Sequence, residues 1–220
     1  MELPDDALMA YMEGLESRHD EPVLSAMEER ARELDFPVVG RVCGVTLELL
    51  ARAIGARRVF ELGSGFGYSA YWLGRAVGAG GEVHCTDADP ANEALARDYL
   101  GRAGVADRVT FHVGDALVAF AAVEGRFDLV YCDVDKEGYP ACWRAARDRI
   151  RRGGLWICDN ALWSGRVARP DPDVETAAID EHNRLVAADP DFLSVIVPAR
   201  DGLLVALRVA EAREPVPSGT

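Results

Sequence analysis

The sequence of 220 residues predicts an α/β fold built on an open, doubly wound sheet with helices on both faces. Five short apolar runs alternate with segments of helical periodicity, which is typical of parallel strands joined by crossover helices. These crossovers are expected to be right-handed, and that handedness places the helices on both sides of the sheet. The length and an apolar fraction of 49% fit one domain with a full-sized core.

The predicted elements begin with two helices at 22–34 and about 42–54, where apolar residues recur at helical spacing. The runs expected to form strands are 59–62, 82–86, 109–113, 127–132 and 155–158, and the helices between them are 68–77, 90–103, 115–122 and 138–150. A loop rich in glycine and proline and a helix near 174–187 follow. Two last strands, at about 191–197 and 202–209, are close enough in sequence to pair as an antiparallel hairpin.

Within this single domain, residues 1–57 are expected to form N-terminal helices, residues 58–210 the core, and residues 211–220 a frayed tail. The start, MELPDDALMA, has neither the basic nor the apolar region of a signal peptide. No apolar run approaches the roughly 20 residues that span a bilayer. Five cysteines form no CxxC pair, and three of them lie in apolar runs, which indicates a reducing compartment. A soluble, cytoplasmic protein is therefore expected.

The charge of the chain is strongly acidic. Lys and Arg number 24 against 37 Asp and Glu, which gives a net charge of −13 and a pI near 4.7. Such a surface repels phosphate backbones and anionic lipids, so nucleic acid and membranes are unlikely partners. Four arginines lie mostly three or four residues apart: Arg144, Arg147, Arg151 and Arg152. They form either a local basic patch or a solvated face with acidic neighbours, and the net charge of the chain favours the solvated face.

A glycine-rich turn, ELGSGFG (61–67), follows the first predicted strand. Its glycines permit a tight turn and let a ligand approach the backbone. The spacing is GxGxG, and the bulky Tyr68 argues against the close packing of a nicotinamide site. Asp87 ends the next strand 20 residues after Gly67, where an acid can accept both hydroxyls of a ribose. The simpler alternative for this motif is a turn that binds no ligand, in which Asp87 caps a helix. Asp115, which follows the third predicted strand, either lies beside the base of a nucleotide or is a helix N-cap.

Three oxygen donors follow the fourth and fifth predicted strands: Asp133, Asp159 and Asn160. These strands are expected to be neighbours whose carboxyl ends open on the same edge as the glycine turn. Two carboxylates and an amide are hard ligands that suit Mg²⁺, whereas the four histidines are scattered, which makes zinc unlikely. Each residue taken alone also fits an ordinary cap or turn, and Lys136 a solvated loop charge. Asp135 is not expected to be a ligand.

Together these motifs resemble the class I, metal-dependent O-methyltransferases of the catechol and caffeoyl-CoA type, which use S-adenosylmethionine. The resemblance covers about residues 36–208 and rests on ELGSGFGYSA (61–70), TDADP (86–90), GDA (114–116), DVDK (133–136), DNALWSGRV (159–167), AIDEHN (178–183) and DGLLVALR (201–208). It implies a Rossmann-like seven-stranded sheet in the order 3-2-1-4-5-7-6 with strand 7 antiparallel. It also implies that residues 1–57 cover the cofactor and substrate and that the protein is a homodimer, as relatives often are.

The resemblance assigns roles residue by residue. The ligands of Mg²⁺, or of another divalent cation, would be Asp133, Asp159 and Asn160, and the catalytic residues would be Lys136, as the base, and Asp133. The residues implied to bind S-adenosylmethionine are Val39, Glu61, Gly63, Ser64, Gly67, Ser69, Asp87, Asp115, Ala116 and Asp133. Two positions depart from the family: Arg200 and Ser164 stand where glycine is common. Both lie near the acceptor side, as does Trp163, which either stacks on a substrate or packs.

The activity implied is transfer of a methyl group to a hydroxyl of a small vicinal dihydroxy aromatic held on the cation. Two alternatives stay open at this point. Some relatives methylate a 5-hydroxyuridine in tRNA, and the four arginines are the feature that would serve such a substrate. An NAD(P)-dependent oxidoreductase has a similar sheet, but Tyr68 and the paired DVDK and DN motifs count against it.

Overall fold

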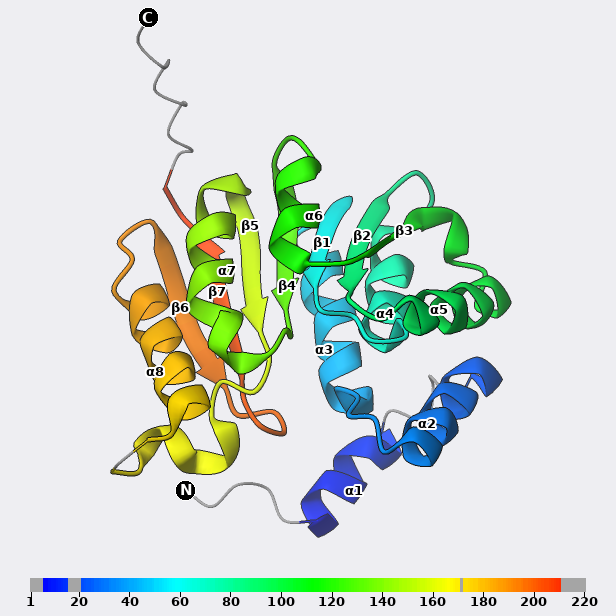
Figure 1. The fold of residues 1–220 in the computed structure, drawn as a ribbon, viewed down its shortest axis with the longest axis horizontal. Coiled ribbons are helices and arrows are strands. Elements are labelled where there is room, and N and C mark those ends of the chain that lie inside the picture. Colours follow the sequence, from blue (N-terminus) through cyan, green and yellow to red (C-terminus); the bar gives the residue numbers. More distant parts are fainter. Residues whose placement is uncertain (1–5, 16–20, 171, 211–220) are drawn as a thin grey trace, which may run out of the picture.

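The computed structural model of the protein describes residues 6–15, 21–170 and 172–210. It consists of one seven-stranded sheet with helices on both faces (Figure 1). The strands are β1 (Arg58–Leu62), β2 (Glu82–Asp87), β3 (Val109–Val113), β4 (Phe127–Cys132), β5 (Ile150–Cys158), β6 (Phe192–Val197) and β7 (Leu203–Arg208). Their order is β3-β2-β1-β4-β5-β7-β6, and β7 runs antiparallel to both its neighbours. The predicted fold and strand order are confirmed.

Eight α-helices are described, and most begin at a recognisable local signal. They are α1 (Asp6–Leu15), α2 (Pro22–Leu34), α3 (Gly40–Ala53), α4 (Tyr68–Val77), α5 (Pro90–Arg102), α6 (Ala116–Ala122), α7 (Tyr139–Ala146) and α8 (Val174–Ala187). The first turns of α5, α6 and α8 are each capped by an aspartate that accepts a backbone N–H bond at 2.8 Å: Asp89, Asp115 and Asp173. Asp115 is therefore an N-cap, as one of its two interpretations proposed.

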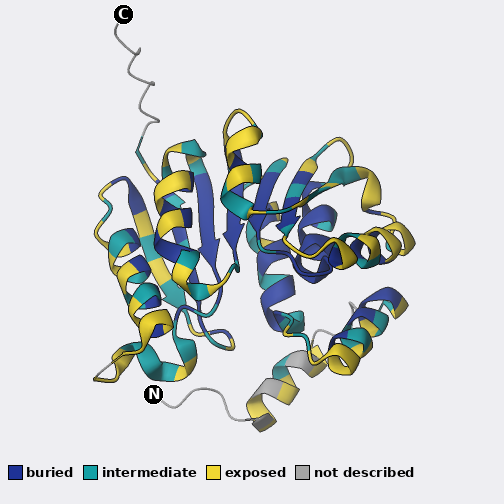
Figure 2. Cartoon of the chain, in the orientation of Figure 1, coloured by how far each residue is buried: buried dark blue, intermediate teal, exposed yellow. Residues whose placement is uncertain are grey.

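Two clusters of buried apolar side chains fill the space between the sheet and its helices. One lies against α2 to α5 and the other against α6, α7 and α8. The central strands are buried on both faces, as their dark blue colour shows (Figure 2). Trp72, Trp143 and Trp156 lie in these clusters, as predicted. All five cysteines are buried and free. None of the described helices combines the length and the apolar character that a membrane span needs.

One predicted boundary is wrong. The helix expected over 138–150 ends at Ala146, and β5 begins at Ile150, five residues before the expected start of that strand. The reason is a bulge against β4, where the pairing moves from Phe127–Ile150 to Leu129–Leu155. Gly153 and Gly154 form this bulge and interrupt the apolar run that would have marked a strand. The tail predicted over 211–220 lies outside the described residues.

The register of the sheet places the tips of three strands side by side. Leu62 of β1 is paired with Cys132 of β4, which is in turn paired with Cys158 of β5. The next residues of the three strands continue this ladder, since Asp133 N donates to Leu62 O at 2.8 Å and Asp159 N donates to Cys132 O at 3.1 Å. The glycine turn and the two aspartates are therefore neighbours because of strand register alone.

Candidate active site

A cavity of about 880 Å³ opens at these strand tips. It is lined by the turn after β1, by the loops after β2 to β5, and by residues 36–39, which precede α3. Eleven predicted site residues line it together: Val39, Gly63, Ser64, Ser69, Asp87, Asp115, Ala116, Asp133, Lys136, Asp159 and Asn160. The other two, Glu61 and Gly67, are buried beside the turn and do not line the cavity.

The glycine turn is held by hydrogen bonds to β2. Gly63 N donates to Thr86 Oγ1 at 3.0 Å, and Ser64 N donates to Thr86 O at 2.8 Å. Gly63 has φ +81°, and a Cβ there would stand 2.5 Å from Asp133 O, so both the backbone and the space require glycine. Thr86 was not among the predicted site residues; its place directly before Asp87 was the available signal.

Asp87 is fixed in one orientation by three donors. Its carboxylate accepts hydrogen bonds from Gly65 N at 3.0 Å, Asp89 N at 2.9 Å and Asn92 Nδ2 at 2.9 Å. A carboxylate held in this way still has one of its roughly four lone-pair sites open for a ribose hydroxyl, and it loses little rotamer freedom on binding. Asn92 was missed because it acts through Asp87 from the first turn of α5.

Glu61 lies behind the turn with no exposed surface. Burial is the main cause that raises the pKa of its carboxyl to about 7, and hydrogen bonds from Ser69 and Ser64 partly oppose the rise. The Ser64 hydroxyl donates to Glu61 Oε2 at 2.7 Å, whereas Oε1 has no hydrogen-bond partner. This carboxyl is enclosed and does not line the cavity, so its contact with a cofactor stays a prediction.

Lys136 is held between an acid and a phenol. Its Nζ donates to Asp133 Oδ1 at 2.9 Å and to the Tyr139 hydroxyl at 2.8 Å, and that hydroxyl donates to Asp159 O at 3.2 Å. Lys136 Nζ also lies 5.7 Å from the centre of the Trp163 ring. The role of Tyr139 was not predicted, although it follows Lys136 by three residues within one helical turn.

The two aspartates next to Lys136 act on each other electrostatically. Asp159 is almost fully buried, and burial followed by the charge of Asp133 raises the pKa of the Asp159 carboxyl to about 7. Asn160 Nδ2 donates to Asp201 Oδ2 at 3.4 Å, which leaves the amide oxygen as the acceptor of that side chain. Two repelling carboxylates and an amide oxygen form a donor set that fits a hard divalent cation. Among the described residues no three or more His, Cys, Asp or Glu side chains are arranged to hold a metal ion.

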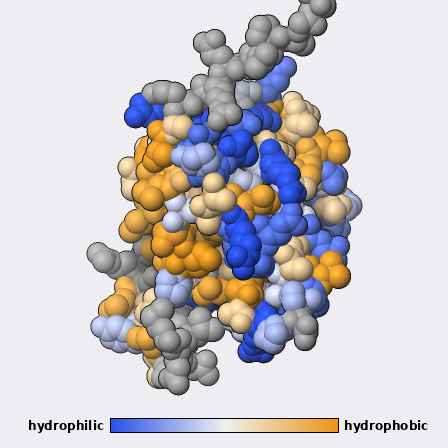
Figure 3. All heavy atoms as spheres, turned by 90° about the vertical axis from the view of Figure 1, so that its left-hand side faces the viewer, coloured by the Kyte–Doolittle hydropathy of each residue, from blue (hydrophilic) through white to orange (hydrophobic). Residues whose placement is uncertain are grey.

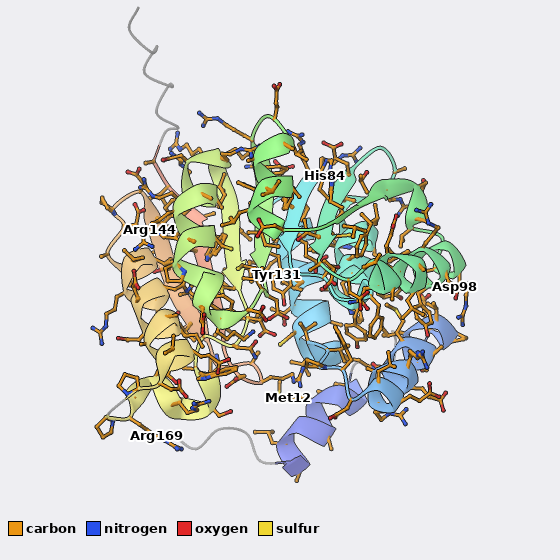
Figure 4. The ribbon with its side chains drawn as sticks, in the orientation of Figure 1. Met12, His84, Asp98, Tyr131, Arg144 and Arg169 are labelled. Carbon is orange, nitrogen blue, oxygen red and sulfur yellow. The ribbon has the colours of Figure 1, made fainter. Side chains whose placement is uncertain are left out.

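None of the three histidines that the structure describes lines the cavity. His84 and His112 are not scattered, because their Nδ1 and Nε2 atoms lie 3.0 Å apart across β2 and β3. His84 stands on β2 in Figure 4, on the stretch of the strand away from the tip that borders the cavity. His182 is buried and accepts a hydrogen bond from Trp156 Nε1 at 3.1 Å. His19 lies outside the described residues.

The side of the cavity expected to receive the acceptor has an unusual backbone. Trp163, Ser164 and Arg200 all have positive φ, at +47°, +52° and +48°. Trp163 lines the cavity and also packs against the cluster under α7 and α8, so its packing is confirmed and its stacking on a substrate stays a prediction. Of the described lining residues, two are basic, Lys136 and Arg200, and eight are acidic: Asp87, Asp89, Asp115, Asp133, Asp135, Asp159, Glu175 and Asp201.

The four arginines considered as a basic patch are largely neutralised. Arg144 of α7, labelled in Figure 4, pairs with Glu181 of α8 at 2.6 Å. Arg147 pairs with Asp189 at 2.6 Å, and Arg151 pairs with Asp128. These ion pairs agree with the expectation of a solvated face with acidic neighbours.

Comparisons with known proteins agree with this geometry. A family model described as O-methyltransferase matches residues 16–209. The chain is 37% identical over 174 residues to a catechol O-methyltransferase of Mycobacterium tuberculosis, covering 78% of this chain and 79% of that protein. It is also similar to the structure of the O-methyltransferase TomG from Streptomyces achromogenes in complex with SAM, with a TM-score of 0.82, 29% identity and coverage of 91% and 96%. An O-methyltransferase from Bacillus cereus in complex with SAH gives a TM-score of 0.79 at 28% identity, with coverage of 87% and 94%.

Proposed function

This chain belongs to the O-methyltransferase family and is an S-adenosylmethionine-dependent O-methyltransferase, and from that premise we propose its acceptor, its metal and its base. The acceptor proposed is a small aromatic with two neighbouring hydroxyls. The cation proposed is Mg²⁺, held by Asp133, Asp159 and Asn160. The observation that carries the proposal is that these three donors and Lys136 line one cavity with the glycine turn and Asp87.

Each residue then has a stated role. Asp87, already oriented by three donors, binds the ribose hydroxyls of the cofactor, and the turn at Gly63 lets the cofactor approach the backbone. When bound, the cation would lower the pKa of the acceptor hydroxyl and fix the position of that hydroxyl. Lys136 Nζ accepts the proton of that hydroxyl, and Asp133 and Tyr139, at 2.9 and 2.8 Å from Nζ, hold the ammonium that results.

Alignment accounts for the rest of the proposed mechanism. The sulfonium methyl is already electrophilic, so transfer gains mainly from proximity and orientation. The Trp163 ring, at the cavity wall, is placed to stack on an aromatic acceptor. The relative called catechol O-methyltransferase supports this acceptor class.

The first test is methyl transfer followed by mass spectrometry. Purified protein with S-adenosylmethionine, Mg²⁺ and a panel of catechols is expected to add one methyl group, and EDTA is expected to suppress the product. Asp159→Ala should abolish turnover, whereas the neighbouring Asp135→Asn, which removes an acid of the same cavity with no proposed role, should keep it. Full activity of Asp159→Ala, or in EDTA, would remove the cation from the mechanism.

Lys136 needs a separate test because its ion pair could also be structural. Lys136→Ala is expected to slow turnover while S-adenosylhomocysteine binds with unchanged affinity in calorimetry. A loss of cofactor binding instead would assign Lys136 a structural role.

We also propose that the protein is a homodimer and that β6 contributes to the interface. β6 is an edge strand, and its Leu193 and Val195 are 67% and 60% exposed. Figure 3 looks onto the side of the molecule that carries β6 and shows hydrophobic side chains gathered there beside strongly hydrophilic ones. Exposed apolar residues on a sheet edge favour association. Light scattering should give twice the chain mass of 23.9 kDa, and Val195→Asp should give a monomer.

A further inference from the structure

The loop between β6 and β7 brings a positive charge to the mouth of the cavity. Arg200 of this loop is exposed and lines the cavity, together with Asp201. It also lines a second hollow of about 690 Å³ beside residues 35–38. Its guanidinium is near enough to Asp159 for the two charges to interact. Arg200 thus stands where the two hollows meet, within electrostatic reach of the proposed cation site.

Arg200 forms no close ion pair with a carboxylate among the described residues, although its charge acts on Asp159 from farther away. Its Nη1 donates to the Val38 carbonyl oxygen at 2.8 Å, and no ion pair is formed with any residue that the structure describes. The other basic residue of the cavity, Lys136, is paired with Asp133 at 2.9 Å. A guanidinium has five N–H donors in a planar fork, so several remain for a ligand.

The backbone at Arg200 is costly for an arginine. Its φ of +48° lies in the left-handed region, where a residue with a Cβ costs on the order of 1 kcal/mol relative to glycine. The guanidinium lies against the start of α3, where a Cβ at Gly40 would stand 2.9 Å from Arg200 Nη1. Strain of this kind is typical of residues that bind or position a ligand.

We propose that Arg200 is a specificity-determining residue that binds a carboxylate on the side chain of the aromatic acceptor. The inference rests on the proposed function, because it names which dihydroxy aromatics the same site prefers. Guanidinium binds carboxylate by paired, charge-assisted hydrogen bonds. Eight of the described lining residues are acidic, and the other basic one, Lys136, is already paired with Asp133. A carboxylate on the acceptor is therefore drawn toward Arg200, which also sets the orientation of the acceptor.

A competing role for Arg200 is to fasten residues 36–39 over the cofactor through its bond to Val38 O. The two roles predict different measurements. A fastener affects the affinity for the cofactor and affects all acceptors equally. A carboxylate-binding residue affects one class of acceptor and leaves the affinity for the cofactor unchanged.

The experiment compares three acceptors that share the diol ring and differ in side-chain charge: 3,4-dihydroxyphenylacetate, 4-ethylcatechol and dopamine. We expect Arg200→Gln to lower kcat/KM for the carboxylate acceptor by about 10- to 100-fold, mainly through KM, and to change the neutral acceptor less than about 2-fold. Arg200→Lys should recover part of the loss, because it keeps the charge without the fork. Arg184→Gln is the matched control, since that side chain is 78% exposed on α8 and pairs with Asp180 of the same helix.

Three outcomes would overturn the inference. A parallel fall for all three acceptors, or weaker binding of S-adenosylhomocysteine by Arg200→Gln without a change in discrimination, would make Arg200 a fastener. Equal use of the charged and neutral acceptors by the wild type would remove the carboxylate preference while the proposed function stands. No methylation of any of the three by the wild type would remove the proposed acceptor class, and the inference with it.

Discussion

Glu61 should make the stability of this protein depend on pH in a way that one substitution removes. Burial raises the pKa of its carboxyl from 4.5 to about 7 in the folded chain. Between these two values the folded state keeps the proton that the unfolded state releases. The free energy of unfolding therefore falls as the pH rises from about 4.5 to about 7 and is level above that. A difference of 2.5 pKa units corresponds to about 3 kcal/mol over the window.

Glu61→Gln isolates this contribution because glutamine resembles the protonated carboxyl and does not titrate. The assay is urea unfolding of both proteins at pH values from 5 to 8.5, followed by the fluorescence of the buried tryptophans. We expect the variant to be close to the wild type at pH 5 and more stable by about 3 kcal/mol above pH 7. Other groups, Asp159 included, titrate in both proteins and cancel in the difference. A difference that stays constant across the window would refute the assignment of a protonated, buried carboxyl.

Three further substitutions test the packing and the turn. Gly44→Ala should destabilise the protein by about 2 kcal/mol or more in urea unfolding, because the new Cβ would stand 2.1 Å from Nε1 of the fully buried Trp72. The control Gly101→Ala, whose Cβ would have no atom within 4 Å, should instead stabilise the protein by up to about 1 kcal/mol. Equal effects of the two substitutions would contradict the close contact between α3 and α4. Ser164→Gly should raise the free energy of unfolding by about 1 kcal/mol, because glycine adopts the φ of +52° at this position without strain. Ser164→Ala is the control that keeps the strain. Equal free energies of unfolding for the two variants would argue against that backbone conformation. Gly63→Ala should abolish binding of S-adenosylhomocysteine in calorimetry, because its Cβ would stand 2.5 Å from a main-chain oxygen at the tip of β4, and retained affinity would mean that the turn is not the cofactor site.

Local patterns accounted for most of the sheet and for the residues gathered at its edge. Buried parallel strands read as short apolar runs, and the aspartate that ends β2 and those that follow β4 and β5 are visible as breaks in those runs. Strand register then brings Gly63, Asp133 and Asp159 together without any long-range information beyond the strand order. The start of β5 was misjudged because the bulge at Gly153 and Gly154 follows from pairing with β4, not from a local signal.

Contacts between distant segments could not be read from any pattern. Arg200 and Val38 are bonded although 162 residues separate them, and nothing in either segment announces the other. Thr86 and Asn92 hold the glycine turn and Asp87 in place, yet each is an ordinary polar residue of a strand or helix in the sequence. Such residues act on the site through another residue, and only their position in space identifies them.

The sequence by itself determined the fold class, the strand order that its motifs imply, and the acids, amide and lysine that meet at one edge of the sheet. The tertiary structure decided the electrostatic state of those groups. Glu61 and Asp159 look like any other carboxylates in the sequence, but burial raises the pKa of each to about 7. Desolvation depends on everything packed around a group, so it is a property of the assembled fold rather than of the neighbouring residues in the chain.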